Sequence, residues 1–320
     1  MWIILTISVT FLQLAEGFPI NNRPIIGVLA QESFKGAPAA TYIPAPYIKW
    51  LESAGARVVP VLLFRENNMK AYCYYKKLFN SMNGILFPGG GVDLMNSQFA
   101  KTAMIFYKLA IQAKDKDGDL FPMWGTCQGF ELMSVLVAKQ NLLTAVDAED
   151  LPLPLNFTTE ATDSVLFGKL PRDVYLPLKT ENVTANYHSW ALTPKNFSEN
   201  KDLRSFFKVL STNTDRNGKE FISSMEAYKY PVYAVQWHPE KNNFVWKSKA
   251  HINHDAHAVR VSQYFADFFV AQARKSPHRF PDFKAENKVV VNNFHPMFDR
   301  KNSLENYYFG FLNETTVTCI

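Results

Sequence analysis

A motif near the middle of the chain places a cysteine at a sharp turn between a strand and a helix. Cys127 stands between Gly125 and Gly129, after an apolar run that ends at Trp124 and before apolar residues that recur at helical spacing over 128–139. A single cysteine in an apolar setting is more often a small core residue, but glycine on both sides leaves room for a tight turn and favours a nucleophile. We therefore predict that Cys127 is a nucleophile, and that the helix N-terminus lowers the pKa of its thiol.

A thiol nucleophile needs a base, and one of the seven histidines stands at the end of a predicted strand. Residues 232–240 read Val-Tyr-Ala-Val-Gln-Trp-His-Pro-Glu, so an apolar strand leads to His238, and Glu240 follows two residues later. A carboxylate at that spacing can orient the imidazole. We predict that His238 is the general base and that Glu240 holds it in place.

In these two motifs the chain resembles the class I glutamine amidotransferase-like superfamily, whose catalytic triad is Cys, His and Glu. Within it, the chain is similar to the gamma-glutamyl hydrolase family in four segments: Pro-Gly-Gly at 88–90, Trp-Gly-Thr-Cys-x-Gly-Phe-Glu at 124–131, Asn-Tyr-His at 186–188 and Tyr-Pro-Val-Tyr-Ala-Val-Gln-Trp-His-Pro-Glu at 230–240. The similarity runs from about Pro24 to about Arg274. It implies a homodimeric hydrolase that trims poly-γ-glutamate from folates and antifolates, with Cys127, His238 and Glu240 as its triad.

A glycine cluster at 88–91 follows the strand expected at 84–87. Such a cluster alone is commonly just a turn. Its place in the β-α unit before the cysteine would lay a backbone N–H beside the scissile carbonyl, and the resemblance assigns it that role. We therefore expect Gly89 and Gly90 to form an oxyanion hole with the amide of Gln128.

Three further residues are expected to hold the substrate. Glu131 lies one helical turn beyond Cys127, so we predict that its carboxylate reaches the pocket and accepts a hydrogen bond from the α-nitrogen of a glutamyl unit. The alternative is a first-turn carboxylate that is favoured only by the helix dipole. We predict that His188, protonated at acidic pH, binds the α-carboxylate. The resemblance adds Tyr47 as a further pocket residue.

Alternating strands and helices in the first half predict an α/β fold. We expect a flavodoxin-like three-layer sandwich, with a mostly parallel central sheet, helices on both faces, hairpin insertions and the site at the carboxyl ends of the strands. Segments 206–213 and 220–228 predict a hairpin, and the proline-rich stretch 151–200 predicts insertions over the site. A helix over 255–275 is expected to bury Val259, Phe265, Phe268 and Phe269. The tail after Pro277 is expected to wrap the domain or to meet a partner.

The first residues read as a secretory leader. Residues 2–15 are apolar, and Ala15-Glu16-Gly17 offers small residues for cleavage, which predicts a signal peptide at 1–17 and one domain at 18–320. The alternative, a retained anchor, stays open because no Lys or Arg precedes the apolar run. Four glycosylation sequons, at Asn156, Asn182, Asn196 and Asn313, also predict a secretory route, to the lysosome and the exterior. Cys73 and Cys319 are left either free or paired.

Composition excludes several classes of function. The net charge of +5 comes from scattered Lys and Arg without a basic run, so nucleic-acid binding is not expected. No segment after the leader is apolar enough to cross a bilayer. His251, His254 and His257 are three residues apart, but at a loop-to-helix junction such residues are usually solvated, and a thiol hydrolase needs neither metal nor cofactor.

Two other functions compete with a γ-glutamyl hydrolase. A glutaminase that delivers ammonia would need a synthase domain or subunit, and the chain is too short to append one. A non-catalytic secreted binding protein on the same fold would not need an intact set of Cys, His and Glu. The sequence leaves endo versus exo cleavage open.

Overall fold

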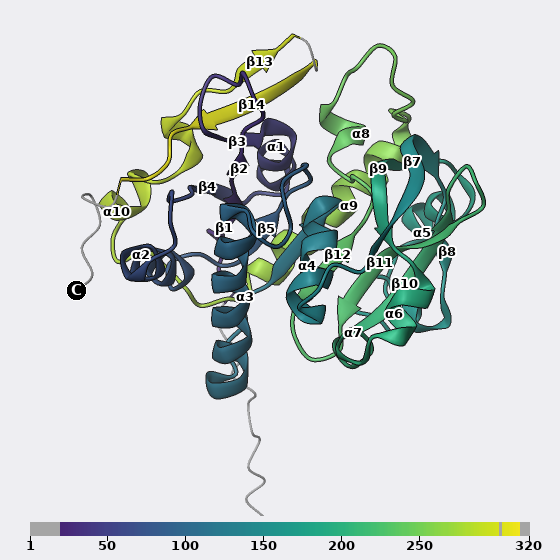
Figure 1. The fold of residues 1–320 in the computed structure, drawn as a ribbon, viewed down its shortest axis with the longest axis horizontal. Helices are drawn as coiled ribbons and strands as arrows, with labels where there is room; N and C mark the ends of the chain where they lie inside the picture. The colour runs from purple at the N-terminus through teal and green to yellow at the C-terminus, as the bar shows by residue number, and fades with distance from the viewer. Residues whose placement is uncertain (1–19, 301–302, 314–320) are drawn as a thin grey trace, which may run out of the picture.

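The fold is built around an eight-stranded sheet in the order β4-β1-β5-β6-β12-β11-β10-β8 (Figure 1). The computed structural model describes residues 20–300 and 303–313, so the predicted signal peptide lies outside the described residues. Five strands are parallel: β4 (Arg57–Val61), β1 (Ile25–Leu29), β5 (Ile85–Phe87), β6 (Met123–Thr126) and β12 (Val232–Val235). The other three are antiparallel: β11 (Glu220–Ala227), β10 (Phe207–Thr214) and β8 (Asn156–Phe157).

The parallel part has the strand order that defines flavodoxin-like sheets, because the first strand lies between the second and the third. The prediction of a mostly parallel α/β sheet is therefore confirmed, as is the hairpin formed by β10 and β11. Parallel strands end at the same edge of a sheet, so the residues after β5, β6 and β12 meet there. Those residues are the glycine cluster, Cys127 and His238.

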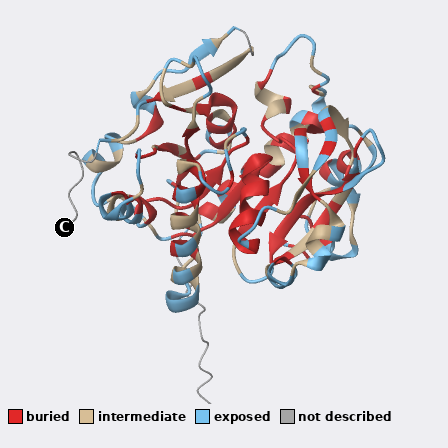
Figure 2. Cartoon of the chain, in the orientation of Figure 1, coloured by how far each residue is buried: buried red, intermediate tan, exposed pale blue. Residues whose placement is uncertain are grey.

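The helices form two groups by their mutual contacts. One group comprises α1 (Ala45–Ser53), α5 (Arg172–Thr180), α8 (Lys241–Phe244) and α9 (Ala256–Ala273). The other comprises α2 (Met69–Phe79), α3 (Gln98–Asp117), α4 (Gln128–Ala138), α6 (Pro194–Glu199) and α7 (Lys201–Phe206). Every residue of α4 is buried, and Figure 2 shows the buried residues gathered in this helix and the central strands. The helix that follows Cys127 is thus fixed on all sides.

Large aromatic side chains join α1 and α9 to the sheet. The Trp124 ring of β6 lies 5.4 Å from Trp50 and 5.5 Å from Phe269, centroid to centroid. One prediction for α9 is wrong: Val259 is 39% exposed, because the buried positions are 258, 261, 262, 265, 266, 269, 270 and 273. That stripe follows the helical period and leaves Val259 beside it.

Two smaller sheets complete the structure. The insertion predicted for 151–200 contains β9 (Thr184–Leu192), which pairs antiparallel with β7 (Leu143–Leu153), so the insertion begins earlier than predicted; the β7–β9 pair lies on the right side of Figure 1. The tail adds α10 (Phe283–Asn287), β13 (Met297–Asp299) and β14 (Leu304–Phe309). Strand β14 pairs with β3 (Thr41–Pro44), which in turn pairs with β2 (Gln31–Glu32). The described part of the tail therefore wraps the domain, which was one of the two expectations for it.

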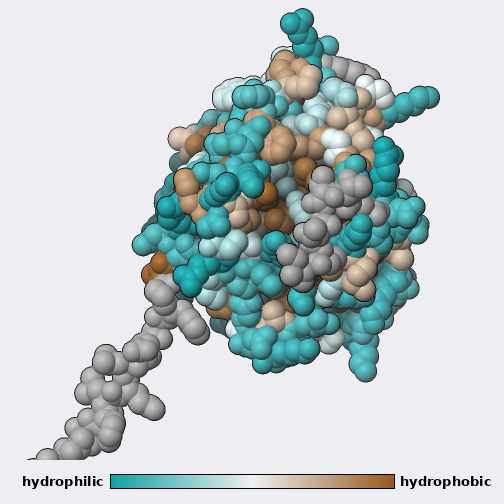
Figure 3. Space-filling model, turned by 90° about the vertical axis from the view of Figure 1, so that its left-hand side faces the viewer, coloured by the Kyte–Doolittle hydropathy of each residue, from teal (hydrophilic) through white to brown (hydrophobic). Residues whose placement is uncertain are grey.

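The exposure of surface residues bears on the predicted glycosylation sites. It is mainly hydrophilic on the face shown in Figure 3, where hydrophobic residues gather in a hollow. Asn156, Asn182 and Asn313 are exposed. Asn196 does not fit a glycan, because its side-chain Nδ2 donates hydrogen bonds to the Leu142 carbonyl (2.7 Å) and to Thr144 Oγ1 (3.1 Å).

Cys73 is disulfide-bonded, and Cys319 lies outside the described residues. Among the helices described, none is long and apolar enough to span a membrane.

Candidate active site

Cys127 has the strained backbone of a nucleophile elbow. It lies between β6 and α4 with φ of 53° and ψ of −111°, in a region that side chains other than glycine rarely adopt. A Cβ on Gly129 would lie 2.0 Å from the Phe87 carbonyl oxygen, and one on Gly125 would lie 2.6 Å from the Gly129 oxygen. Both glycines are therefore required by backbone contacts. The turn presents Cys127 at the edge of the sheet.

His238 reaches the same edge because β12 is the parallel neighbour of β6, with Val235 opposite Thr126. Its Nδ1 lies 2.7 Å from Glu240 Oε1, and both side chains are buried. The His238 backbone N–H donates to the Ala185 carbonyl of β9 at 2.9 Å, which fixes the segment after the strand. Glu240 thus holds the ring as predicted for an orienting carboxylate, which favours a proton on Nδ1 and a lone pair on Nε2.

The glycine cluster brings these groups together. A Cβ on Gly89 would lie 2.7 Å from the Tyr47 hydroxyl, 2.8 Å from His238 Cε1 and 3.2 Å from Cys127 Cβ. The Tyr47 hydroxyl lies 3.2 Å from His238 Nδ1 and accepts a hydrogen bond from the Gly89 N–H at 2.8 Å. Tyr47 therefore links the glycine cluster to the imidazole.

The Gly89 interaction changes the prediction for the oxyanion hole. Because its N–H donates to Tyr47, Gly89 does not offer that N–H to a substrate in this state. Gly90 and Gln128 remain as the candidate donors. A Cβ on Gly90 would lie 1.7 Å from Gln31 Oε1, so the cluster is packed tightly against this buried side chain.

Gln31 follows β1 and was not predicted from the sequence. Its Nε2 donates to the Pro88 carbonyl at 3.3 Å and to Gln128 Oε1 at 3.2 Å, and Gln128 in turn bonds the backbone of Val92. It therefore ties the glycine cluster to the first residue of α4. A polar residue directly after a buried strand, at the carboxyl edge of a parallel sheet, is the signal that could have identified it.

The thiol of Cys127 and the imidazole of His238 form no hydrogen bond with each other in this structure. Cys127 Sγ lies 3.7 Å from the Tyr187 carbonyl oxygen, to which it donates a weak hydrogen bond. His238 Nε2 is buried and has no hydrogen-bond partner in the part of the chain that the structure describes. Rotation about the Cα–Cβ bond of Cys127 is the motion that would redirect the thiol, and catalytic hydrogen bonds often form only with substrate bound.

Electrostatics oppose the predicted lowering of the thiol pKa. Burial and the charge of Glu131 raise the pKa of Cys127 well above its usual value, although Lys241 and the Gln128 N–H act to lower it. Burial and Lys241 also lower the pKa of His238, against the attraction of Glu240. Both shifts favour a neutral thiol and a neutral imidazole over a thiolate–imidazolium pair. The helix N-terminus is present, but desolvation outweighs it.

Two predicted pocket residues face elsewhere. The Glu131 carboxylate accepts a hydrogen bond from Gln236 Nε2 at 3.0 Å, and burial raises the pKa of Glu131 to about 7. His188 is buried with Nδ1 3.0 Å from the Trp190 carbonyl and Nε2 3.2 Å from Asn186 Oδ1. Burial lowers the pKa of His188 to about 3, so a protonated ring that receives an α-carboxylate does not fit this structure.

A cavity of about 300 Å³ opens beside Cys127 and His238. Tyr47, Gly89 and Gly90 line it as predicted, whereas Glu131 and His188 do not. Its walls also contain residues to which the sequence analysis gave no role, from β7, β9, α8 and β14: Glu149, Tyr187, Lys241, Leu304 and Asn306. The cavity is therefore closed by the insertion and by the tail strand β14.

The described residues contain no cluster of three metal-ligating side chains. The three closely spaced histidines face different groups: Asp150 for His251, the Asn242 carbonyl for His254 and Glu181 for His257.

Comparison with known proteins finds one matching family and several similar proteins with the same name. Residues 24–240, which include all three predicted triad residues, match the peptidase C26 family. The chain is 50% identical over 282 residues to a gamma-glutamyl hydrolase of Homo sapiens, across 87% of this chain and 86% of that protein. It is 50% identical over 281 residues to a gamma-glutamyl hydrolase of Mus musculus, with the same coverage of 87% and 86%. It is 36% identical over 304 residues to gamma-glutamyl hydrolase B of Dictyostelium discoideum, across 93% and 86%.

Proposed function

Because the chain belongs to the peptidase C26 family, with gamma-glutamyl hydrolases as its relatives, we propose that it hydrolyses γ-glutamyl amide bonds of folate and antifolate poly-γ-glutamates. One observation carries the assignment of the site. A strained elbow cysteine, Cys127, and a carboxylate-held imidazole, His238, line one cavity together. This is the arrangement that nucleophilic catalysis by a thiol requires.

The reaction follows from the groups in the cavity. Cys127 Sγ attacks the γ-carbonyl carbon while His238 Nε2 takes the thiol proton, and His238 then gives that proton to the leaving amine as the C–N bond breaks. The thioester is next attacked by water, whose proton passes to His238 and then to the Cys127 thiolate as the C–S bond breaks. Glu240 keeps Nδ1 protonated, so that Nε2 has its lone pair free for each transfer.

The neutral resting pair determines when the proton moves. With the thiol pKa raised and the imidazole pKa lowered by burial, the neutral pair is favoured at rest, so the thiol proton passes to His238 during the attack. The amides of Gly90 and Gln128 then stabilise the negative oxygen, and one such donor is worth roughly 2.7–4 kcal/mol.

Mass analysis of the products from a defined poly-γ-glutamate tests this proposal. The protein should release glutamate or short γ-linked fragments, and it should leave an α-linked glutamate peptide of the same length intact. Cys127→Ala should lower turnover at least a hundredfold while the protein stays folded. Ammonia release from free glutamine, with the γ-linked chain left intact, would instead identify a glutaminase. No turnover of any of the three would identify a binding protein.

The proposal extends to assembly and location. We propose a homodimer, which the resemblance implies, and a secretory route to the lysosome and the exterior, which the apolar leader and the exposed Asn156 and Asn182 sequons support. Protein from eukaryotic cells should begin near Phe18, lose mass on deglycosylation and sediment as a dimer. A full-length, unglycosylated monomer would contradict all three parts.

A further inference from the structure

We propose that Lys241 and Glu149 form the receptor for the glutamyl unit under attack, Lys241 for its α-carboxylate and Glu149 for the N–H on its α-carbon. The inference rests on the proposed function, since it names the groups by which this cavity would recognise a γ-linked chain. It replaces the roles predicted for His188 and Glu131, which do not line the cavity.

Lys241 is the residue directly after Glu240 and begins α8. Its ammonium lies 4.9 Å from the ring centroid of Tyr187, and both residues line the cavity. Among the residues that the structure describes, none forms an ion pair with Lys241. A partly buried cation held against an aromatic ring, beside the nucleophile, is a fitting receptor for a carboxylate.

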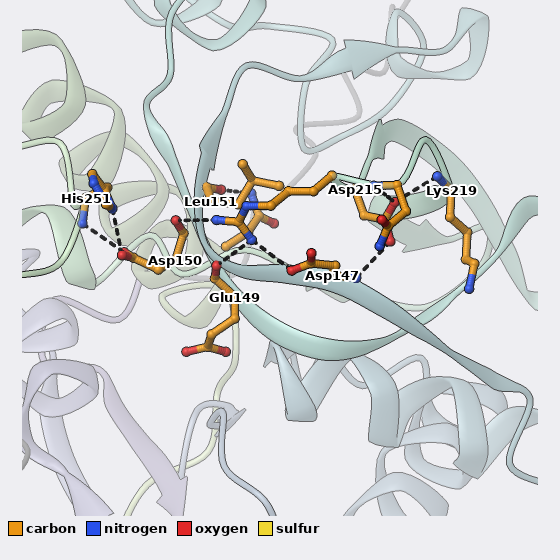
Figure 4. Close-up of polar contacts among 10 residues, drawn as sticks. Asp147, Glu149, Asp150, Leu151, Asp215, Lys219 and His251 are labelled. Carbon is orange, nitrogen blue, oxygen red and sulfur yellow. Dashed lines mark hydrogen bonds and ion pairs between the residues drawn. The ribbon is translucent and has the colours of Figure 1, made fainter.

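Glu149 also lines the cavity and lies on β7, where the ladder with β9 shifts register between Glu149 and Leu151. Asp150, at this bulge, has a left-handed φ of 53°. Bulges often turn a side chain toward a functional site. Figure 4 shows the Glu149 carboxylate pointing away from the polar contacts around it, and no drawn contact reaches its oxygens.

Two sets of contacts fix the backbone at this bulge. Arg216, in the turn between β10 and β11, donates to the Glu149 carbonyl at 2.8 Å and to the Asp150 carbonyl at 3.1 Å. The Asp150 carboxylate accepts a hydrogen bond from the Tyr187 hydroxyl and another from the His251 backbone N–H at 2.8 Å. These contacts join β7, β9 and the segment after α8, and Figure 4 shows the contacts between Asp150 and His251. The Glu149 carboxylate is therefore held in place by its backbone while remaining open to a ligand.

The chemistry of a γ-linked chain matches this pair. Each internal unit keeps a free α-carboxylate, because the γ-carboxyl group forms the amide bond, and its acylated α-nitrogen carries one N–H. A cation binds the first group and a carboxylate accepts from the second. In an α-linked chain the α-carboxyl is consumed in the backbone, so Lys241 would select the linkage.

Lys241 also acts on the catalytic groups through its charge, since it lowers the pKa of both Cys127 and His238. Replacing it would therefore change turnover of every substrate, whatever its role in binding. A ratio between two substrates cancels that general effect, because the field on the thiol and imidazole is the same for both.

The experiment compares two γ-glutamyl peptides that differ only at the α-carbon of the cleaved unit, one with a carboxylate and one with a carboxamide. In the wild type, kcat/KM should favour the carboxylate. Lys241→Gln should reduce that preference roughly 10- to 150-fold, the range for a hydrogen bond to a charged group. Lys241→Arg should retain most of it. Lys249→Gln, which removes an exposed positive charge outside the cavity, is the matched control and should leave the preference unchanged.

A second comparison tests Glu149. Glu149→Ala should lower kcat/KM roughly tenfold for the carboxylate peptide and leave it nearly unchanged for a peptide methylated at that α-nitrogen, which has no N–H to donate. An unaltered carboxylate preference in Lys241→Gln, or equal losses on both peptides in Glu149→Ala, would overturn the inference while γ-glutamyl hydrolysis stands. Failure of the wild type to cleave either peptide would instead overturn the proposed function.

Discussion

Gly90→Ala is the substitution whose consequence the structure defines most sharply. The new Cβ would lie 1.7 Å from Gln31 Oε1, 2.4 Å from its Cδ and 2.6 Å from its Nε2, so the amide has to move. Gln31 is fully buried and donates to the Pro88 carbonyl and to Gln128 Oε1. Losing these contacts should lower the free energy of unfolding by about 1–3 kcal/mol. The displaced cluster should also remove one oxyanion donor, which costs about 10²- to 10³-fold in kcat.

The assay pairs denaturant unfolding with kcat on a γ-glutamyl peptide. Gly91→Ala is the matched control, because no atom lies within 4 Å of the position of its Cβ, and it should change stability by less than about 0.5 kcal/mol. A double variant with Gln31→Ala adds a second check. Since that change removes the side chain that Gly90→Ala displaces, adding Gly90→Ala to it should cost little further stability. If Gly90→Ala matched Gly91→Ala in both stability and kcat, the packing argument for this loop would be refuted.

Three further predictions concern single polar groups. Tyr47→Phe leaves the buried Gly89 N–H without its acceptor, so denaturant unfolding should show a loss of about 1–3 kcal/mol; no loss would mean that another acceptor replaces the hydroxyl. Burial acts to lower the pKa of His278, but its hydrogen bond to Asp119 raises the pKa overall and lowers that of Asp119. A raised histidine pKa contributes stability below its unfolded value and loses it as pH rises through the folded value, whereas a lowered Asp pKa contributes stability above its unfolded value. His278→Gln should therefore lower the free energy of unfolding most at pH values between the pKa of Asp119 in the unfolded chain and the pKa of His278 in the folded protein. A loss that does not depend on pH would contradict the ion pair. Glu131→Gln should speed alkylation of the Cys127 thiol above about pH 7, where Glu131 is charged, and have little effect below it; equal effects at all pH values would remove Glu131 as a cause.

The positions of Cys127, His238 and Glu240 could be predicted from the sequence, because local residue patterns and the topology of a parallel sheet agree. Glycines around Cys127 and an apolar strand before His238 define two strand ends, and parallel neighbours must finish at one edge. Glu240 follows His238 so closely that its contact with the ring depends on little else. Tyr47 came from family resemblance alone, because nothing in its helical period indicates that its hydroxyl meets Gly89.

The rest of the cavity depends on features that sequence patterns do not encode. Glu149 faces it through a bulge that pairs with β9 and is held by Arg216, which lies more than sixty residues away in the chain. Asn306 joins it through the pairing of β14 with β3. For Glu131, helical spacing correctly placed the residue one turn from Cys127. The buried side-chain amide of Gln236 then determined its direction, and the carboxylate turned away from the cavity.

Trapping of the acyl-enzyme tests the central claim most directly. Protein quenched in acid during turnover of a γ-glutamyl peptide should carry the mass of the acyl fragment, and peptide mapping should place that mass on the segment that contains Cys127. The account predicts that the adduct is absent from Cys127→Ala, together with nearly all turnover. An adduct on any other residue, or full turnover in Cys127→Ala, would contradict the assignment of Cys127 as the nucleophile.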